Sequence, residues 1–141
     1  MLLYQAAVRH FKSHKILRQE IVLLVQTFGL SIQEWVVLSV LLNHGIKNTS
    51  ELAEELGVER PMVTQLTANL EKLGYIEKKT GEEDRRERYF SLLSDGQTVV
   101  ERIEGKLTTY LAARFSTVTQ AELNGYLKVL ALIIDGPTPN P

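Results

Sequence analysis

The sequence predicts a mainly helical protein with one small β-hairpin, an α+β fold in which helices dominate. Three observations carry this prediction. Apolar residues recur every three or four positions over most of the 141 residues. Capping patterns and glycines divide that periodicity into separate helices. Residues 75–92 alone replace it with two short β-rich runs around a polar segment.

The composition indicates one globular domain in a reducing compartment. Hydrophobic residues make up 44% and charged residues 23% of the chain, which is ordinary for such a domain. The absence of cysteine excludes disulfides, thiolate zinc sites and cysteine nucleophiles. No apolar run approaches the roughly 18 residues that cross a bilayer, and the N-terminus lacks a secretory pattern, so we expect a cytoplasmic protein with no membrane partner.

Residues 2–28 form the first expected helix, a long amphipathic one without internal glycine or proline. Gly29 ends it. Ser31 and Glu34 then have the capping-box spacing, in which a hydroxyl and a carboxylate satisfy the free amides at a helix start. A second helix over about 32–43 follows.

Two short helices come next. Asn48 and Glu51 cap a helix over 49–56, and Pro61 lies in the first turn of another, where its missing amide hydrogen costs nothing. The second helix has a narrow inward stripe made of Val63, Leu66, Leu70 and Leu73. Two short helices joined by a tight turn predict a helix-turn-helix.

The remaining elements complete the plan. Residues 75–79 and 88–92 predict a two-stranded hairpin with a long charged tip. Capping-box patterns at Ser94 and Thr119 open two more helices, which end near residues 115 and 134. The last of these is apolar nearly all round at its end, which predicts burial.

The order of elements is that of a winged helix-turn-helix carried on long helices. We expect one unit over 1–141, with the winged region at 31–93, helical dimerisation regions at 1–30 and 94–135, and a tail at 136–141. The terminal helices have more apolar surface than the central unit can cover, which favours a twofold homodimer. Such a dimer would place two reading helices about 34 to 36 Å apart, one turn of a duplex.

These residues carry a resemblance to a known family. The motifs are Glu51-Leu52-Ala53, Leu56-Gly57-Val58, Val63-Thr64-Gln65-Leu66, Leu70-Glu71-Lys72-Leu73-Gly74-Tyr75-Ile76, Asp84-Arg85-Arg86, Ser91-Leu92 and Gly96. Together they resemble the multiple antibiotic resistance regulator (MarR) family over nearly the whole chain. The resemblance implies a sequence-specific DNA-binding transcription regulator, most commonly a dimeric repressor that leaves its double-stranded operator when a small aromatic or lipophilic effector binds.

The outward face of the second short helix is the expected reading surface, because an α-helix fits the major groove. The residues outside the core stripe, which make up this face, are Arg60, Pro61, Met62, Thr64, Gln65, Ala68 and Asn69. Gln65 can pair with adenine and Thr64 can touch a thymine methyl, each contact being worth about 1 to 3 kcal/mol of discrimination. The alternative is a merely solvated helix face.

The hairpin tip is the second expected contact. An arginine there can enter the narrow minor groove. The resemblance assigns this role to Arg86, with Asp84 holding its guanidinium in a forked pair, and the remaining phosphate contacts are expected from Arg85, Arg88, Lys78 and Lys79. The alternative is a salt-bridged surface loop.

Three positions depart from the family pattern. Glu59 stands at the capping position where the family often has Ser, and Gln65 stands where many members have Arg. Leu93 replaces the usual Thr before the next helix, so we expect Ser94 to act as the cap. Moreover, seven basic and seven acidic residues balance between Glu59 and Arg88. This balance keeps open a second hypothesis, a winged-helix protein-interaction module that does not bind DNA, and a third is a carrier or enzyme that uses the dimer crevice.

Other candidate sites are weaker. His10 and His14 lie four residues apart on one helix face, but two imidazoles do not make a metal site, so we expect no metal. Trp35 reads as a core anchor, while the resemblance offers it, with His10, Phe11, His14 and Leu38, as a wall of an effector crevice. No residues have the spacing of a nucleophile, metal or phosphate-binding centre, so we expect neither an enzyme nor a cofactor.

Overall fold

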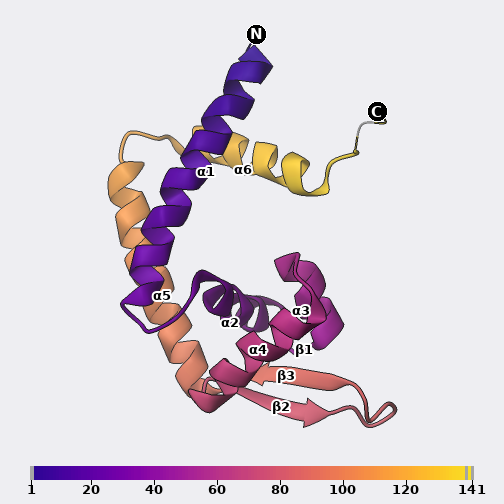
Figure 1. The fold of residues 1–141 in the computed structure, drawn as a ribbon. Coiled ribbons are helices and arrows are strands. Elements are labelled where there is room, and N and C mark those ends of the chain that lie inside the picture. Colours follow the sequence, from indigo (N-terminus) through magenta and orange to yellow (C-terminus); the bar gives the residue numbers. More distant parts are fainter. Residues whose placement is uncertain (1, 139, 141) are drawn as a thin grey trace. The chain divides into compact units, whose positions relative to one another are not determined.

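The computed structural model describes residues 2–138 and 140 and consists mainly of helices with one small antiparallel sheet (Figure 1). The elements are α1 (Leu2–Gln26), α2 (Ile32–His44), β1 (Lys47–Asn48), α3 (Thr49–Leu56), α4 (Arg60–Lys72), β2 (Ile76–Thr80), β3 (Arg88–Leu92), α5 (Ser94–Arg114) and α6 (Gln120–Asp135). The predicted fold class is thereby confirmed. Of the predicted N-terminal region and tail, residues 1, 139 and 141 lie outside the described part.

Local capping chemistry starts three of the helices as predicted. Full capping boxes begin α2, α3 and α6, formed by the pairs Ser31–Glu34, Asn48–Glu51 and Thr119–Glu122. The prediction for Ser94 is wrong. Helix α5 already includes Ser94, and the backbone N–H of Gln97 donates to the Leu93 carbonyl at 2.9 Å. Leu93 therefore holds the capping position, because that residue's carbonyl accepts the first helical hydrogen bond.

The sheet has three strands rather than the predicted two, in the order β1-β3-β2. Strands β2 and β3 pair antiparallel from Ile76 opposite Leu92 to Thr80 opposite Arg88. Strand β1 adds Asn48 opposite Tyr89 on the other edge of β3. A two-residue strand is too short to show any alternation of apolar residues, so it could not be predicted from the sequence pattern.

One core joins α2, α3, α4 and the sheet. Helices α1 and α5 also contribute to it, through Val25 and through Val100 and Ile103, and its largest fully buried side chains are Leu38, Leu52, Leu70, Ile76 and Ile103. In α4 the stripe of Val63, Leu66 and Leu70 is buried as predicted, but Leu73 is 44% exposed and Thr67 is only 2% exposed. Thr67 enters the core because its hydroxyl donates to the Val63 carbonyl at 2.8 Å, which satisfies the hydroxyl within its own helix.

The chain divides into two compact units, one ending at Leu107 and the other beginning at Thr108. The core lies in the first unit. Each unit has long helical faces with large apolar side chains in solvent: Leu2, Leu3, Tyr4, Val8 and Phe11 on α1, and Tyr126, Leu127, Val129, Leu132, Ile133 and Ile134 on α6. The predicted burial of the end of α6 is thus absent within the single chain. No helix among the described residues could span a membrane.

Candidate nucleic-acid interface

Helix α4 presents a continuous exposed face beside its buried stripe. All seven residues expected to read bases, Arg60, Pro61, Met62, Thr64, Gln65, Ala68 and Asn69, are exposed. The Thr64 hydroxyl donates a hydrogen bond to the Arg60 carbonyl at 3.2 Å, so this donor is already paired within its own helix. Thr64 is therefore suited to apolar contact through its methyl group, the role expected of it.

Asn69 differs from the other residues of this face. Its side-chain nitrogen donates to a carboxylate oxygen of Glu34, in the first turn of α2. Glu34 is only 8% exposed. Residues 35 positions apart are thus joined across the two helices, and the Asn69 amide is already bonded within the chain.

The segment between β2 and β3, residues 81–87, is a tied loop, and we call it the wing tip. The N–H of Gly81 donates to the Glu87 carbonyl at 2.9 Å, and the N–H of Glu87 donates to the Asp84 carbonyl at 3.1 Å. The Asp84 side chain accepts the backbone N–H of Arg86 at 2.9 Å. This corrects the expected forked pair: a short Asp side chain reaches the amide two residues on more readily than it reaches a guanidinium.

The residues at the base of the wing tip add further bonds. One guanidinium nitrogen of Arg88 donates to the carbonyls of Arg85 at 2.5 Å and Glu87 at 3.2 Å. The Tyr89 hydroxyl donates to the Glu87 carboxylate at 2.6 Å, and this bond, together with the negative charge, raises the pKa of Tyr89 above its ordinary 10.0. The tip is therefore ordered by its own bonds, and the Arg85 and Arg86 side chains stay exposed.

A groove of about 590 Å³ connects the wing tip to the start of α4. Its lining consists of Thr49, Arg60, Pro61, Thr64, Arg86 and Arg88. Three guanidinium groups and two hydroxyls line this groove without any carboxylate. The sequence does not predict Thr49 as part of this groove, because it lies at the start of α3, where the pattern indicates only a helix cap.

The acidic residues of the wing lie elsewhere. Glu82, Glu83, Asp84 and Glu87 line a second hollow, also about 590 Å³, together with Ile46, Lys79, Thr80, Gly81, Tyr89, Phe90 and Ser91. The charges between Glu59 and Arg88 cancel in the sum, but they are not evenly mixed in space. Three of the seven basic residues line the first groove without a carboxylate, whereas four of the seven acidic residues, together with Lys79, line the second hollow.

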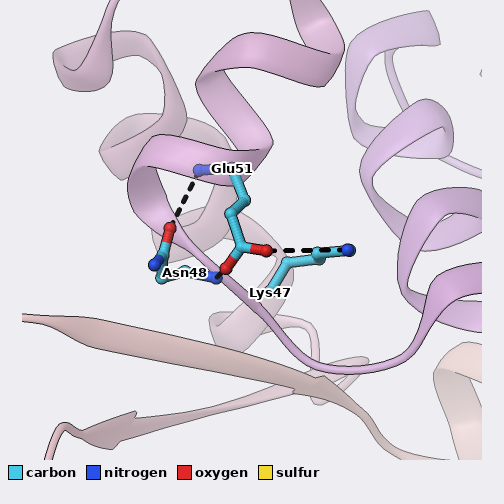
Figure 2. A network of polar contacts seen from close by, with 3 residues as sticks. All are labelled: Lys47, Asn48 and Glu51. Atoms are coloured by element: carbon cyan, nitrogen blue, oxygen red, sulfur yellow. Dashed lines mark hydrogen bonds and ion pairs between the residues drawn. The ribbon is translucent and has the colours of Figure 1, made fainter.

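A small polar network of Lys47, Asn48 and Glu51 lies at the start of α3, the helix that begins with Thr49 (Figure 2). Asn48 and Glu51 exchange two hydrogen bonds, of 3.1 and 2.8 Å, and Lys47 lies 3.6 Å from the Glu51 carboxylate. Lys47 and Asn48 are also the two residues of β1, paired with β3. The network therefore holds the first turn of α3 against the strand that leads out of the wing.

The two lysines of β2 are exposed, and each has an acidic neighbour. Lys78 lies 3.7 Å from the Glu71 carboxylate and Lys79 lies 3.9 Å from that of Glu77. Exposed pairs of this kind are weak. At the start of α4, Glu59 occupies the capping position as expected, but its side chain makes no capping hydrogen bond.

The residues proposed for an effector crevice differ widely in exposure. Phe11 is 74% exposed, whereas Leu38 is fully buried in the core, so these two do not share an accessible wall. Trp35 is half-buried, and its ring nitrogen is shielded from solvent without a hydrogen-bond partner, as is the Ser39 hydroxyl one turn later. Among residues 2–138 and 140, no three His, Asp or Glu side chains are grouped to hold a metal.

Comparisons with known proteins support this picture. The MarR family model matches residues 30–87. YpoP, an HTH-type transcriptional regulator of Bacillus subtilis described as uncharacterised, is 32% identical over 94 residues, which cover 67% of each chain. The HTH-type transcriptional regulator PapX of Escherichia coli is 32% identical over 94 residues, which cover 65% of this chain but only 57% of PapX. The fold is shared with NadR, solved in complex with 4-hydroxyphenylacetate, at a TM-score of 0.78, 18% identity and 91% coverage of both chains.

Proposed function

Because the chain belongs to the MarR family of DNA-binding transcription regulators, we propose that it binds a double-stranded operator as a homodimer and represses transcription until an effector releases it. The observation that carries this proposal is the basic groove shared by the start of α4 and the wing tip. Two segments that are 26 residues apart, at Arg60 and Arg86, meet there with one sign of charge.

In this proposal the two segments contact different parts of the duplex. The exposed face of α4, with Thr64 and Gln65 foremost, enters the major groove and contacts base edges. Arg86, at the end of an ordered tip, extends into the adjacent minor groove. The groove between them, with Arg60 and Thr49, receives the intervening phosphate backbone, because guanidinium and hydroxyl groups are the side-chain donors that phosphate prefers.

The exposed apolar faces support the homodimer. Large apolar side chains on α1 and α6 remain in solvent in the single chain. Exposed apolar surfaces of this kind mark interfaces, and a second copy of the chain is the simplest partner that could bury them. Dimerisation would then set the spacing of the two α4 helices, and a ligand that changes this spacing would release the operator. We propose that the protein acts in the cytoplasm.

The effector proposal is supported by two buried polar atoms. The Trp35 ring nitrogen and the Ser39 hydroxyl lie one turn apart on α2 without partners, and buried polar groups normally have one. A small molecule with a carbonyl or carboxylate acceptor would satisfy both donors. NadR, which shares the fold, was solved with 4-hydroxyphenylacetate, a molecule that has such an acceptor.

The test is binding of purified protein to fluorescent duplexes at increasing salt concentration. We expect affinity for random duplex that falls steeply with salt and tighter binding to fragments selected from the source genome. The variant Arg86→Ala should weaken binding, and Arg60→Ala, which removes a guanidinium group from the groove that receives the phosphate backbone, should reduce the slope of log K against log salt by about 0.9, the value for one lost phosphate contact. Arg18→Ala, which removes an exposed arginine of α1, is the matched control and should leave the slope unchanged.

Absence of DNA binding at low salt would decide between the two hypotheses. A folded dimer with no affinity for any duplex would favour the protein-interaction module instead. The charge balance that kept this alternative open argues less strongly for it, since the groove lined by Arg60, Arg86 and Arg88 contains no carboxylate. No residue arrangement in the described part of the chain indicates an enzyme.

A further inference from the structure

The contact between Asn69 and Glu34 gives the exposed face of α4 a second role. Asn69 lies four residues after Gln65 and eight after Pro61, so the three share one side of the helix. The helical pattern alone predicts that all three residues contact bases. The Asn69 side chain, however, donates its hydrogen bond to Glu34 of α2.

Glu34 is a rigid partner. Its second carboxylate oxygen accepts the backbone N–H of Ser31 at 3.0 Å, and its own N–H donates to the Ser31 hydroxyl at 3.1 Å. The side chain is buried, with 8% exposure. The carboxylate that holds Asn69 cannot move without opening the cap of α2.

We propose that Asn69 is a positioning residue, which fixes the rotation of α4 about its own axis through Glu34, rather than a residue that reads a base. The proposal rests on the DNA-binding function proposed above. The contact between Asn69 and Glu34 joins α4 to α2. In this proposal it holds the exposed face of α4 at the angle that base contact requires.

The physical reason is that apolar packing is not directional. Val63, Leu66 and Leu70 hold α4 at a set distance from the core, but such contacts tolerate small rotations of the helix. A rotation of about 20° moves a side-chain tip by about 2 Å, given a helix radius of about 5 to 6 Å with side chains. A base contact by Gln65 would not survive that shift, because hydrogen bonds extend over only about 0.5 Å.

The second polar link of α4 does not replace this contact. Lys78 lies 3.7 Å from Glu71, but both side chains are about two-fifths exposed, at 45% and 39%. Exposed ion pairs of long, flexible side chains restrict geometry little. The buried, hydrogen-bonded carboxylate of Glu34 is therefore the stronger constraint on α4.

An exchange of the two side-chain types tests the proposal. Asn69→Asp places a carboxylate against that of Glu34 and should weaken binding to a duplex selected by the unmodified protein about tenfold or more. Glu34→Gln keeps an oxygen for the Ser31 amide and an amide for residue 69, so it should stay within about threefold. In the double variant Asn69→Asp/Glu34→Gln, the new glutamine amide donates to the new carboxylate, and affinity should return to within about threefold.

The double variant has the same net charge as the unmodified chain, which removes a general electrostatic explanation of the rescue. Gln65→Glu is the matched control: it adds an acid to the same face, and Glu34→Gln should not rescue it. A double variant that binds as weakly as Asn69→Asp, while urea unfolding shows it to be folded, would mean that residue 69 faces the DNA and would overturn the proposal. Absence of binding by the unmodified chain would instead overturn the proposed function.

Discussion

Gly81→Ala should disorder the wing tip without unfolding the protein. Gly81 is buried where β2 enters the tip, and a methyl group added there would lie 2.5 Å from the Asp84 carbonyl oxygen, 3.2 Å from the Tyr89 ring and 3.3 Å from Glu87 Cβ. The closest of these contacts is to backbone, so it cannot be relieved by turning a side chain. The tip itself must shift.

The shift should break the two backbone hydrogen bonds that close the tip, Gly81 to Glu87 at 2.9 Å and Glu87 to Asp84 at 3.1 Å. At about 1 kcal/mol net for each bond, the ordered tip loses about 2 kcal/mol. Because every 1.4 kcal/mol is a factor of ten, DNA affinity should fall by up to about 30-fold. The core lies outside this region, so the urea midpoint should change little.

Fluorescence anisotropy with a selected duplex measures the loss, and circular dichroism checks the helix content. Gly105→Ala in α5 is the matched control, since a methyl group there meets nothing within 4 Å and should leave binding unchanged. Wild-type affinity for Gly81→Ala would refute the reasoning, because it would mean that an ordered tip is not needed to place Arg86.

Three further predictions test capping, titration and assembly. Asn48→Ala removes the cap of α3 and should lower the free energy of unfolding by about 1 kcal/mol in urea titrations. Hydrogen bonds from Thr119 lower the pKa of Glu122 below its ordinary 4.5; the stabilisation is therefore present above pH 4.5 and lost as the pH falls through the depressed value, so Glu122→Gln should flatten the acid dependence of thermal unfolding. Leu127→Asp puts a charge in the exposed apolar face of α6 and should yield a monomer in sedimentation velocity, whereas an unchanged dimer would place the interface elsewhere.

The features that the sequence predicted are mostly local. A capping box needs a donor and an acceptor three residues apart, and Ser31, Asn48 and Thr119 each form one as expected. Ser94 has the same spacing and does not cap, because the helix starts one residue earlier than the pattern suggests. Spacing alone does not decide which residue lies at the first helical position.

The features that could not be predicted from the sequence depend on contacts between distant segments. Strand β1 exists only because Lys47 and Asn48 pair with residues more than 40 positions away. The Glu34–Asn69 bond joins residues 35 positions apart and changes the proposed role of an exposed amide. Helical periodicity shows that Asn69 is outside the core, but it does not show what the side chain meets there.

The separation of charge has consequences for how this chain finds DNA. A net charge of −1 gives no long-range attraction to a polyanion, and beyond a Debye length of about 8 Å the interaction between exposed charges is largely screened. Once the duplex is bound, the nearest charges dominate, because the Coulomb energy between two charges falls with the distance between them. A phosphate in the basic groove lies nearest to Arg60, Arg86 and Arg88, so its interaction with the protein is attractive. Association should therefore be slow for a DNA-binding protein and only weakly dependent on salt, while dissociation should accelerate steeply as salt rises. Affinity in this arrangement comes from groups that meet the duplex, and the acidic hollow on the same wing limits attraction to DNA that has not yet docked.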